Sequence, residues 1–242
     1  MHANDDHQFL FSPSGNLTPH PFRHENLGYV RERDVLPIAR FSNTILAIGV
    51  SEKLGATTLK ELIAVAKQRP RQLNVVLVPG ITELVWDGFC KVEGVEFTKV
   101  PFSNLVQGAG EMATGTVHVT FSALAIMQPV LQGKGARLLA VTSRNRVPLL
   151  PDVPTALESG VPSLEVEGLV GLFGPPSVRP DLRRGIGEDV AEIARLPHVA
   201  ERLAATGQIP NPGGAEEFSA DILRQEKQVA EIARILGLGR KS

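Results

Sequence analysis

Small residues that carry hydroxyl groups follow four predicted strands of this chain, where each strand gives way to a turn or a helix. Free amides at helix N-termini, helped by nearby hydroxyls, can hold a carboxylate, because the amides are unpaired donors and the helix dipole is positive there. The predicted ligand-binding residues are Ser12, Ser14, Gly15, Gly80, Thr82, Ser122, Thr142 and Ser143. Helix capping needs the same residue types, so capping is the alternative at each position. Recurrence after four separate strands favours a shared cleft.

Motifs of known enzyme classes are mostly absent. There is no Gly-Xaa-Ser-Xaa-Gly, no His-Glu-Xaa-Xaa-His and no P-loop. Gly108 and Gly110 lie inside a predicted helix rather than at a strand-to-helix turn, so a dinucleotide site is not expected. Cys90 falls on an apolar helix face, which predicts a buried, inert thiol. His20 and His24 lack further ligands at metal spacing, so we expect neither a metal nor a cofactor.

The elements that position these residues alternate between strand and helix. Strands are expected at 73–78, 95–100, 116–121 and 136–141, with helices between them, and this alternation predicts βαβ units and a mostly parallel sheet. The apolar run Ala136–Val141 predicts a strand buried on both faces. Prolines 148, 151 and 154 then predict a stiff loop at its C-terminal end, where ligands bind in open α/β sheets. The alternative is a mere proline-stiffened connection.

The ends of the chain carry further extended runs. A strand is expected at 8–12, two apolar runs lie at 35–40 and 44–50, and a long extended run is expected at 164–173. An amphipathic helix is expected over 216–236, with Phe218, Ile222 and Val229 on one side.

Composition narrows the class of protein. The chain has 242 residues, of which 43% are hydrophobic and 21% charged, as in ordinary globular proteins. A net charge of −1 argues against a nucleic-acid partner. The single cysteine excludes an intrachain disulfide, and no run reaches the roughly 18 apolar residues of a membrane span. The first residues lack the basic start and apolar stretch of a signal peptide.

Three blocks in order resemble the Bug/TctC family of extracytoplasmic solute receptors, the substrate-binding proteins of tripartite tricarboxylate transporters. The most specific block is Ala-Val-Thr-Ser followed by Leu-Pro-Asp-Val-Pro-Thr, over residues 140–155. Val100–Phe102 resembles the family's Val-Pro-Tyr, and Leu172–Pro176 resembles its apolar strand running into Ala-Pro. The resemblance extends from about Asp6 to the C-terminus.

The resemblance implies an α/β, periplasmic-binding-protein-like fold of two domains with a ligand cleft between them. Residues 1–43 and 164–242 would form the first domain and 44–163 the second. By position, Ser14 and Gly15 match the family's first-domain loop, and Gly80 and Thr82 match a second loop that here has lost most of its glycines and serines. Ser122 stands where the family has Asp. These departures put the usual ligand in doubt, and Glu83 would repel an anion near its turn.

The expected function is therefore that of a receptor, not an enzyme. It would capture a small di- or tricarboxylate-like acid in the periplasm and deliver it to membrane subunits of a tripartite tricarboxylate-type transporter. The rivals are an α/β enzyme such as a hydrolase, and a truncated receptor that no longer binds ligand.

The truncation hypothesis comes from the start of the match, well inside the family's first domain. The family's early Pro-Phe-Pro-Ala-Gly-Gly loop has no counterpart here. We expect Phe9, Phe11, Phe173 and the final helix to leave apolar surface and strand edges exposed. We therefore expect this chain to bind carboxylates weakly or not at all, and to associate with other copies of itself or aggregate.

Overall fold

The computed structural model describes residues 8–241. The chain divides into two compact units, Met1–Thr44 with Gly168–Ser242 and Ile45–Glu167. We call them the flanking unit and the middle unit. It stays a prediction that the chain forms two domains, one of residues 1–43 with 164–242 and the other of residues 44–163. Asp6, where the family resemblance begins, lies outside the described residues.

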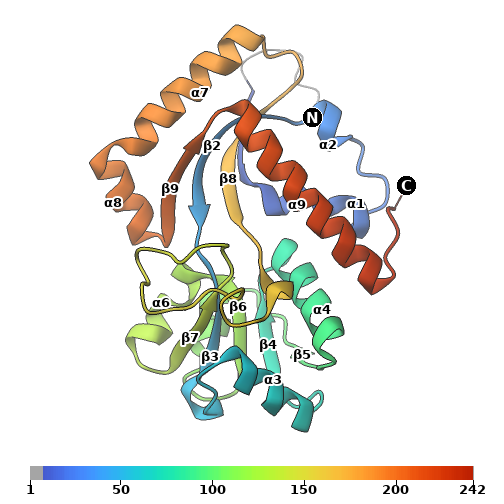
Figure 1. The fold of residues 1–242 in the computed structure, drawn as a ribbon, viewed down its shortest axis with the longest axis vertical. Coiled ribbons are helices and arrows are strands. Elements are labelled where there is room, and N and C mark those ends of the chain that lie inside the picture. Colours follow the sequence, from blue (N-terminus) through green and yellow to red (C-terminus); the bar gives the residue numbers. More distant parts are fainter. Residues whose placement is uncertain (1–7, 242) are drawn as a thin grey trace. The chain divides into compact units, whose positions relative to one another are not determined.

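The flanking unit is built on a four-stranded sheet in the order β1-β8-β2-β9 (Figure 1). Its strands are β1 (Leu10–Pro13), β2 (Leu36–Thr44), β8 (Gly168–Gly174) and β9 (Gln208–Gly213). All three pairings are antiparallel. Leu10 lies opposite Phe173, so residues far apart in the sequence share one sheet.

Helices cover the two faces of this sheet. Phe173 packs on Phe218 of α9 (Ala215–Leu236), with ring centroids 5.1 Å apart. The neighbouring Leu172 points the other way, because side chains alternate along a strand. It packs against the core cluster of Ile38, Ala39 and Val178, as do Leu182 and Ile186 of α7 (Pro180–Arg195). The remaining helices of the unit are α1 (His20–Arg23), α2 (Arg31–Asp34) and α8 (Pro197–Ala205).

Exposure of the aromatic residues only partly follows expectation. Phe9 and Phe11 are 38% and 57% exposed, as predicted. The prediction that Phe173 is exposed is wrong. Phe173 is fully buried, because α9 packs over it.

Strand β9 is absent from the sequence-based prediction. Pro210 and Pro212 lie within it, and proline cannot donate to a strand ladder. The structure accommodates both because β9 is the last strand of the order and, among the described residues, is paired only with β2.

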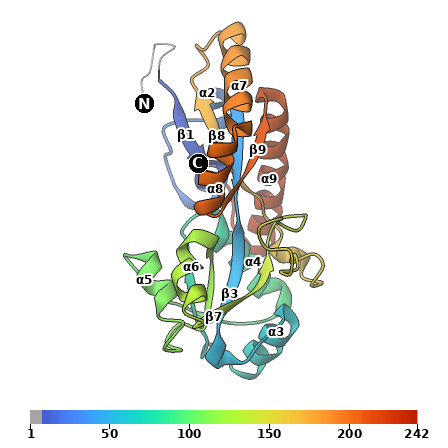
Figure 2. The ribbon, with the colours of Figure 1, turned by 90° about the vertical axis from the view of Figure 1, so that its left-hand side faces the viewer.

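The middle unit contains a five-stranded sheet in the order β5-β4-β6-β3-β7 (Figures 1 and 2). The strands are β3 (Leu46–Ser51), β4 (Asn74–Leu77), β5 (Thr98–Lys99), β6 (Val119–Ala123) and β7 (Ala136–Val141). The helices are α3 (Leu59–Gln68), α4 (Ile81–Glu93), α5 (Leu105–Gly110) and α6 (Leu124–Gln132).

The expectation of a mostly parallel sheet needs correction. β4 pairs in parallel with β5 and β6, but β3 runs antiparallel to both β6 and β7. β3 follows directly from β2 without a crossover helix, and it runs in the opposite direction to the other four strands of the sheet. β4, β5, β6 and β7 still share one direction.

β7 was expected to be buried on both faces, and over its second half it is: Leu139, Ala140 and Val141, whose side chains alternate between the two faces, are all buried. β7 is nevertheless the last strand of the order, and within residues 8–241 β3 is the only strand in its sheet that it pairs with. The proline-containing loop returns beside its end: the amide of Val141 donates to Pro154 at 3.0 Å, and that of Ala156 donates to Val141 at 2.9 Å. The loop thus covers part of a free strand edge.

Candidate functional site

The C-terminal ends of β4, β6 and β7 lie at one edge of the middle sheet. Leu77 is paired with Phe121, while Ser122 and Val141 both lie opposite Ala47 of β3. Ser122 and Val141 are therefore two strand spacings apart, about 10 Å. The predicted residues that lie at or just beyond these strand ends are Gly80, Thr82, Ser122, Thr142 and Ser143.

A tight turn joins β4 to α4. Gly80 has φ 113° and ψ −134°, a conformation that side-chain-bearing residues avoid. Gly80 is also the N-cap and brings no capping side chain. The hydroxyl of buried Thr82 donates back to the carbonyl of Val78, which stiffens the turn. The first-turn amides of α4 have no acceptor within the helix, so this end is suited to an anion.

Strand β6 runs directly into α6. Ala123 is the N-cap and offers no side-chain cap. The hydroxyl of Ser122, only 1% exposed, donates to its own neighbour Ala123 at 3.4 Å, a long bond. Of the predicted hydroxyls, that of Ser122 is the one held most weakly.

The two residues after β7 differ in their hydrogen bonding. Thr142 is fully buried, and its hydroxyl donates to Val166 at 2.9 Å. The hydroxyl is therefore already engaged in joining β7 to the chain segment that leaves the unit. Ser143 is half-buried and donates to the carbonyl of Asn145 at 2.8 Å, as a turn residue does.

Charges near this edge are paired. Glu83 lies 3.2 Å from the ammonium of Lys99, which offsets the repulsion that Glu83 would exert on an anion. Arg144 follows Ser143 and is exposed, with its Nε 3.2 Å from Glu165. The amide of Arg144 donates to Glu167 at 3.0 Å. A cation thus lies beside the strand ends.

The other predicted residues, Ser12, Ser14 and Gly15, belong to the flanking unit. Ser14 and Gly15 lie in the turn after β1, and both are buried. The hydroxyl of Ser14 donates to Gln225 of α9 at 2.7 Å, and that of Ser12 donates to Pro13 at 3.1 Å. That this group and the strand ends of the middle unit face one cleft stays a prediction.

Sequence reasoning missed Gln225 and Thr18. Thr18 also donates to the Gln225 side chain, at 3.2 Å. A signal was present: Gln225 is a polar residue in the apolar stripe that includes Phe218, Ile222 and Val229. A buried polar side chain in such a stripe requires a partner.

The site offers binding groups rather than a nucleophile. In the described part of the chain, the predicted hydroxyls donate to main-chain carbonyls or, for Ser14, to an amide oxygen. Burial, and then Asp87, raise the pKa of the Cys90 thiol to about 12, so the thiol stays protonated. Within residues 8–241, no three metal-ligating side chains are grouped as a metal ion would require. No described helix has the length and apolar character needed to cross a bilayer.

Similar proteins were found by sequence. A "UPF0065 protein in tcbD-tcbE intergenic region" of Pseudomonas sp. (strain P51) is 25% identical over 228 residues, covering 93% of this chain and 67% of its own length. The chain spans about two thirds of the length of this relative and of two further curated relatives.

Solved structures have the same fold. Rpa4515 of R. palustris, solved with adipate, has a TM-score of 0.78 at 24% identity, covering 96% of this chain and 78% of its own. MatC of Rhodopseudomonas palustris, solved with malate, has a TM-score of 0.73 at 21% identity, covering 93% and 80%. These likenesses show a periplasmic-binding-protein fold. The family model described as "Tripartite tricarboxylate transporter family receptor" matches residues 5–238. This chain therefore belongs to the TctC family of tripartite tricarboxylate transporter receptors.

Proposed function

We propose that this protein is a periplasmic solute receptor that captures a small organic carboxylate and delivers it to the membrane subunits of a tripartite tricarboxylate-type transporter. It performs no chemistry on its ligand. The observation that carries the proposal is the meeting of two helix N-termini without a side-chain cap, those of α4 and α6, at the strand ends that also bear Ser122.

Two helix dipoles that point at the same edge favour a negative charge there. Ser122 has only a long bond to Ala123, so its hydroxyl can turn to donate to a carboxylate oxygen without leaving a buried acceptor unpaired. The solved relatives that hold adipate and malate support a dicarboxylate as the ligand class. Arg144 supplies a cation beside the site for a second carboxylate.

The test is calorimetric titration of the purified chain with adipate, malate and citrate, using 1,6-hexanediol as the uncharged analogue of adipate. We expect binding of at least one acid and none of the diol. Ser122→Ala should weaken binding of that acid by about ten- to a hundredfold, the loss of one hydrogen bond to a charged group. Ser219→Ala is the matched control, because the Ser219 hydroxyl donates to Ala215 within α9.

The outcomes separate the rival functions. A chain that binds none of the acids is a receptor that has lost its ligand, and the proposal fails. Conversion of an acid, seen by mass spectrometry of the recovered ligand, identifies an enzyme. Delivery is tested separately, by ligand-dependent retention of the chain on vesicles that contain the transporter's membrane subunits; retention that ignores the ligand contradicts it.

A further inference from the structure

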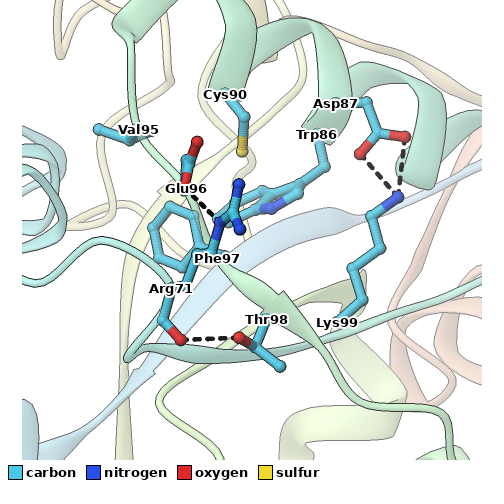
Figure 3. Close-up of a pocket in the computed structure, with 9 residues that line it drawn as sticks. All are labelled: Arg71, Trp86, Asp87, Cys90, Val95, Glu96, Phe97, Thr98 and Lys99. Carbon is cyan, nitrogen blue, oxygen red and sulfur yellow. Dashed lines mark hydrogen bonds and ion pairs between the residues drawn. The ribbon is translucent and has the colours of Figure 1, made fainter.

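A pocket of about 310 Å³, which we call the cavity, lies beside α4 (Figure 3). Its wall includes Trp86 and Cys90 from α4, Phe97 and Lys99 from the segment that follows that helix, and Arg71 from the turn before β4. None of the predicted carboxylate-binding residues is among those that line it in the described part of the chain. The cavity lies entirely within the middle unit.

Trp86 carries a buried donor. Its side chain is 1% exposed and packs against Phe89 and Phe97, with ring centroids 5.0 and 4.9 Å away. Its Nε1 has no hydrogen-bond partner among residues 8–241. An unpaired N–H in an apolar surrounding is unfavourable, and native structures rarely keep one. In Figure 3 this nitrogen points toward the space where the Cys90 sulfur and the Arg71 guanidinium also lie.

The inner end of the cavity therefore presents donors. The raised pKa of Cys90 keeps its thiol as S–H, a weak donor. Arg71 has φ 60° and is tied at three points: its amide donates to Glu96 at 3.1 Å, its carbonyl accepts from Thr98 at 2.7 Å, and its Nε donates to the Glu96 carboxylate at 2.6 Å. Its side chain is 77% exposed, and a rotation that releases its bond to Glu96 would admit a molecule to the indole N–H.

Charge around the cavity is balanced. Arg71 is paired with Glu96, and Lys99 lies 2.7 Å from Asp87 and 3.2 Å from Glu83. An anion would meet Glu96 and Asp87, and a cation would meet Arg71 and Lys99. An uncharged molecule meets neither penalty, and the aromatic walls of Trp86 and Phe97 suit a flat ring.

We propose that this cavity is a second binding site, which takes a small uncharged ring compound carrying a primary carboxamide. The amide oxygen accepts the N–H of Trp86, the amide nitrogen donates to Glu96, and the ring lies against Phe97. This site does not depend on the proposed carboxylate site.

The experiment uses the fact that Trp86 is the chain's one tryptophan. A sample labelled with ¹⁵N at the indole gives one indole N–H signal, which is titrated with benzamide, benzoate and benzamidinium. The three probes share shape and differ in charge. We expect a saturable shift with benzamide and at least fivefold weaker binding of the other two. No saturable shift at millimolar benzamide overturns the proposal, as does equal or tighter binding of either charged probe.

Two variants test the assigned contacts. Trp86→Phe keeps a ring but loses the donor, so benzamide binding followed by calorimetry should weaken about fivefold. Cys90→Leu fills the cavity and keeps the reporter, and it should abolish the shift. Val92→Leu is its control, because Val92 is 56% exposed on the same helix. Unchanged benzamide affinity in Cys90→Leu contradicts the site even if Trp86→Phe fails to fold.

Discussion

At the scale of single residues, His118 accepts a main-chain hydrogen bond. The amide of Asn74 donates to its Nδ1 at 2.9 Å, and the amide of His118 donates to the Asn74 carbonyl at 3.0 Å. Burial, and then the charge of Arg69, lower the pKa of His118 below its ordinary 6.5. Protonation would fill the lone pair that accepts the Asn74 amide, so this contact requires the neutral ring.

We predict that the His118 contact makes stability depend on pH. Because the folded-state pKa is lowered, the unfolded chain binds the proton more readily. The contribution is therefore complete above about pH 6.5 and is lost as the pH falls through the lowered value. Urea unfolding of the wild type should lose more free energy between about pH 7.5 and 5 than that of His118→Gln, whose amide does not titrate. Equal losses in the two proteins would rule this out.

Thr142 gives a second prediction at this scale. Its buried hydroxyl donates to Val166 at 2.9 Å, so Thr142→Val leaves a buried carbonyl short of a partner. We expect the free energy of unfolding to fall by about 1–3 kcal/mol in guanidinium titrations. Thr142→Ser retains the hydroxyl and should fall by much less. An unchanged free energy of unfolding in Thr142→Val would show that the hydroxyl has no role in holding the end of β7 to the segment around Val166.

At the scale of elements, the turn from β4 to α4 depends on Gly80. Its φ of 113° with ψ −134° is a conformation open in practice to glycine alone. Gly80→Ala should therefore destabilise the chain by about 1–3 kcal/mol in thermal or chemical unfolding. The substitution should also displace the first-turn amides of α4 and so weaken the binding of any carboxylate that they hold.

The control for Gly80 is the same substitution elsewhere. Gly185 lies inside α7, and an added Cβ there meets no atom within 4 Å. Gly185→Ala should raise the free energy of unfolding by about 0.5–1 kcal/mol, because alanine is the better helix former. If both variants move stability in the same direction, the assigned conformation of Gly80 is wrong.

At the scale of the whole molecule, β1 leaves apolar surface in reach of other molecules. Phe11 is 57% exposed and contacts Phe41 edge to face, with centroids 5.7 Å apart. β1 is also the last strand of its sheet, paired within residues 8–241 only with β8. Such edges and patches promote association.

We predict concentration-dependent self-association that Phe11→Thr reduces. Removing a phenyl ring from a contact of this kind should raise the concentration at half-association about tenfold, as measured by sedimentation velocity. Val92→Thr, at a 56% exposed position on α4, should leave it unchanged. A wild type that stays monomeric at high concentration contradicts the role of this edge.

Much of the local structure could be predicted from the sequence. One of the helices expected between the strands is α6 (Leu124–Gln132), and the helix expected over 216–236 is α9 within one residue. The sequence Thr-Leu-Lys-Glu at 58–61 predicts an N-cap for α3, and the structure has it, with Thr58 accepting from the Glu61 amide at 3.2 Å. Apolar periodicity and caps act between residues a few positions apart, so they can be read along the chain. The family resemblance and the receptor fold also followed from the sequence.

The partners of each element required the tertiary structure. The antiparallel direction of β3, the edge position of β7 and the existence of β9 depend on which strands meet, and alternation along one strand does not specify its neighbour. The same holds for the site. The turn hydroxyls were visible in the sequence, but that of Ser14 is engaged by Gln225, 211 residues away, and that of Thr142 by Val166. A hydroxyl is available to a ligand only if no distant residue already accepts its proton, and folding alone brings those residues together.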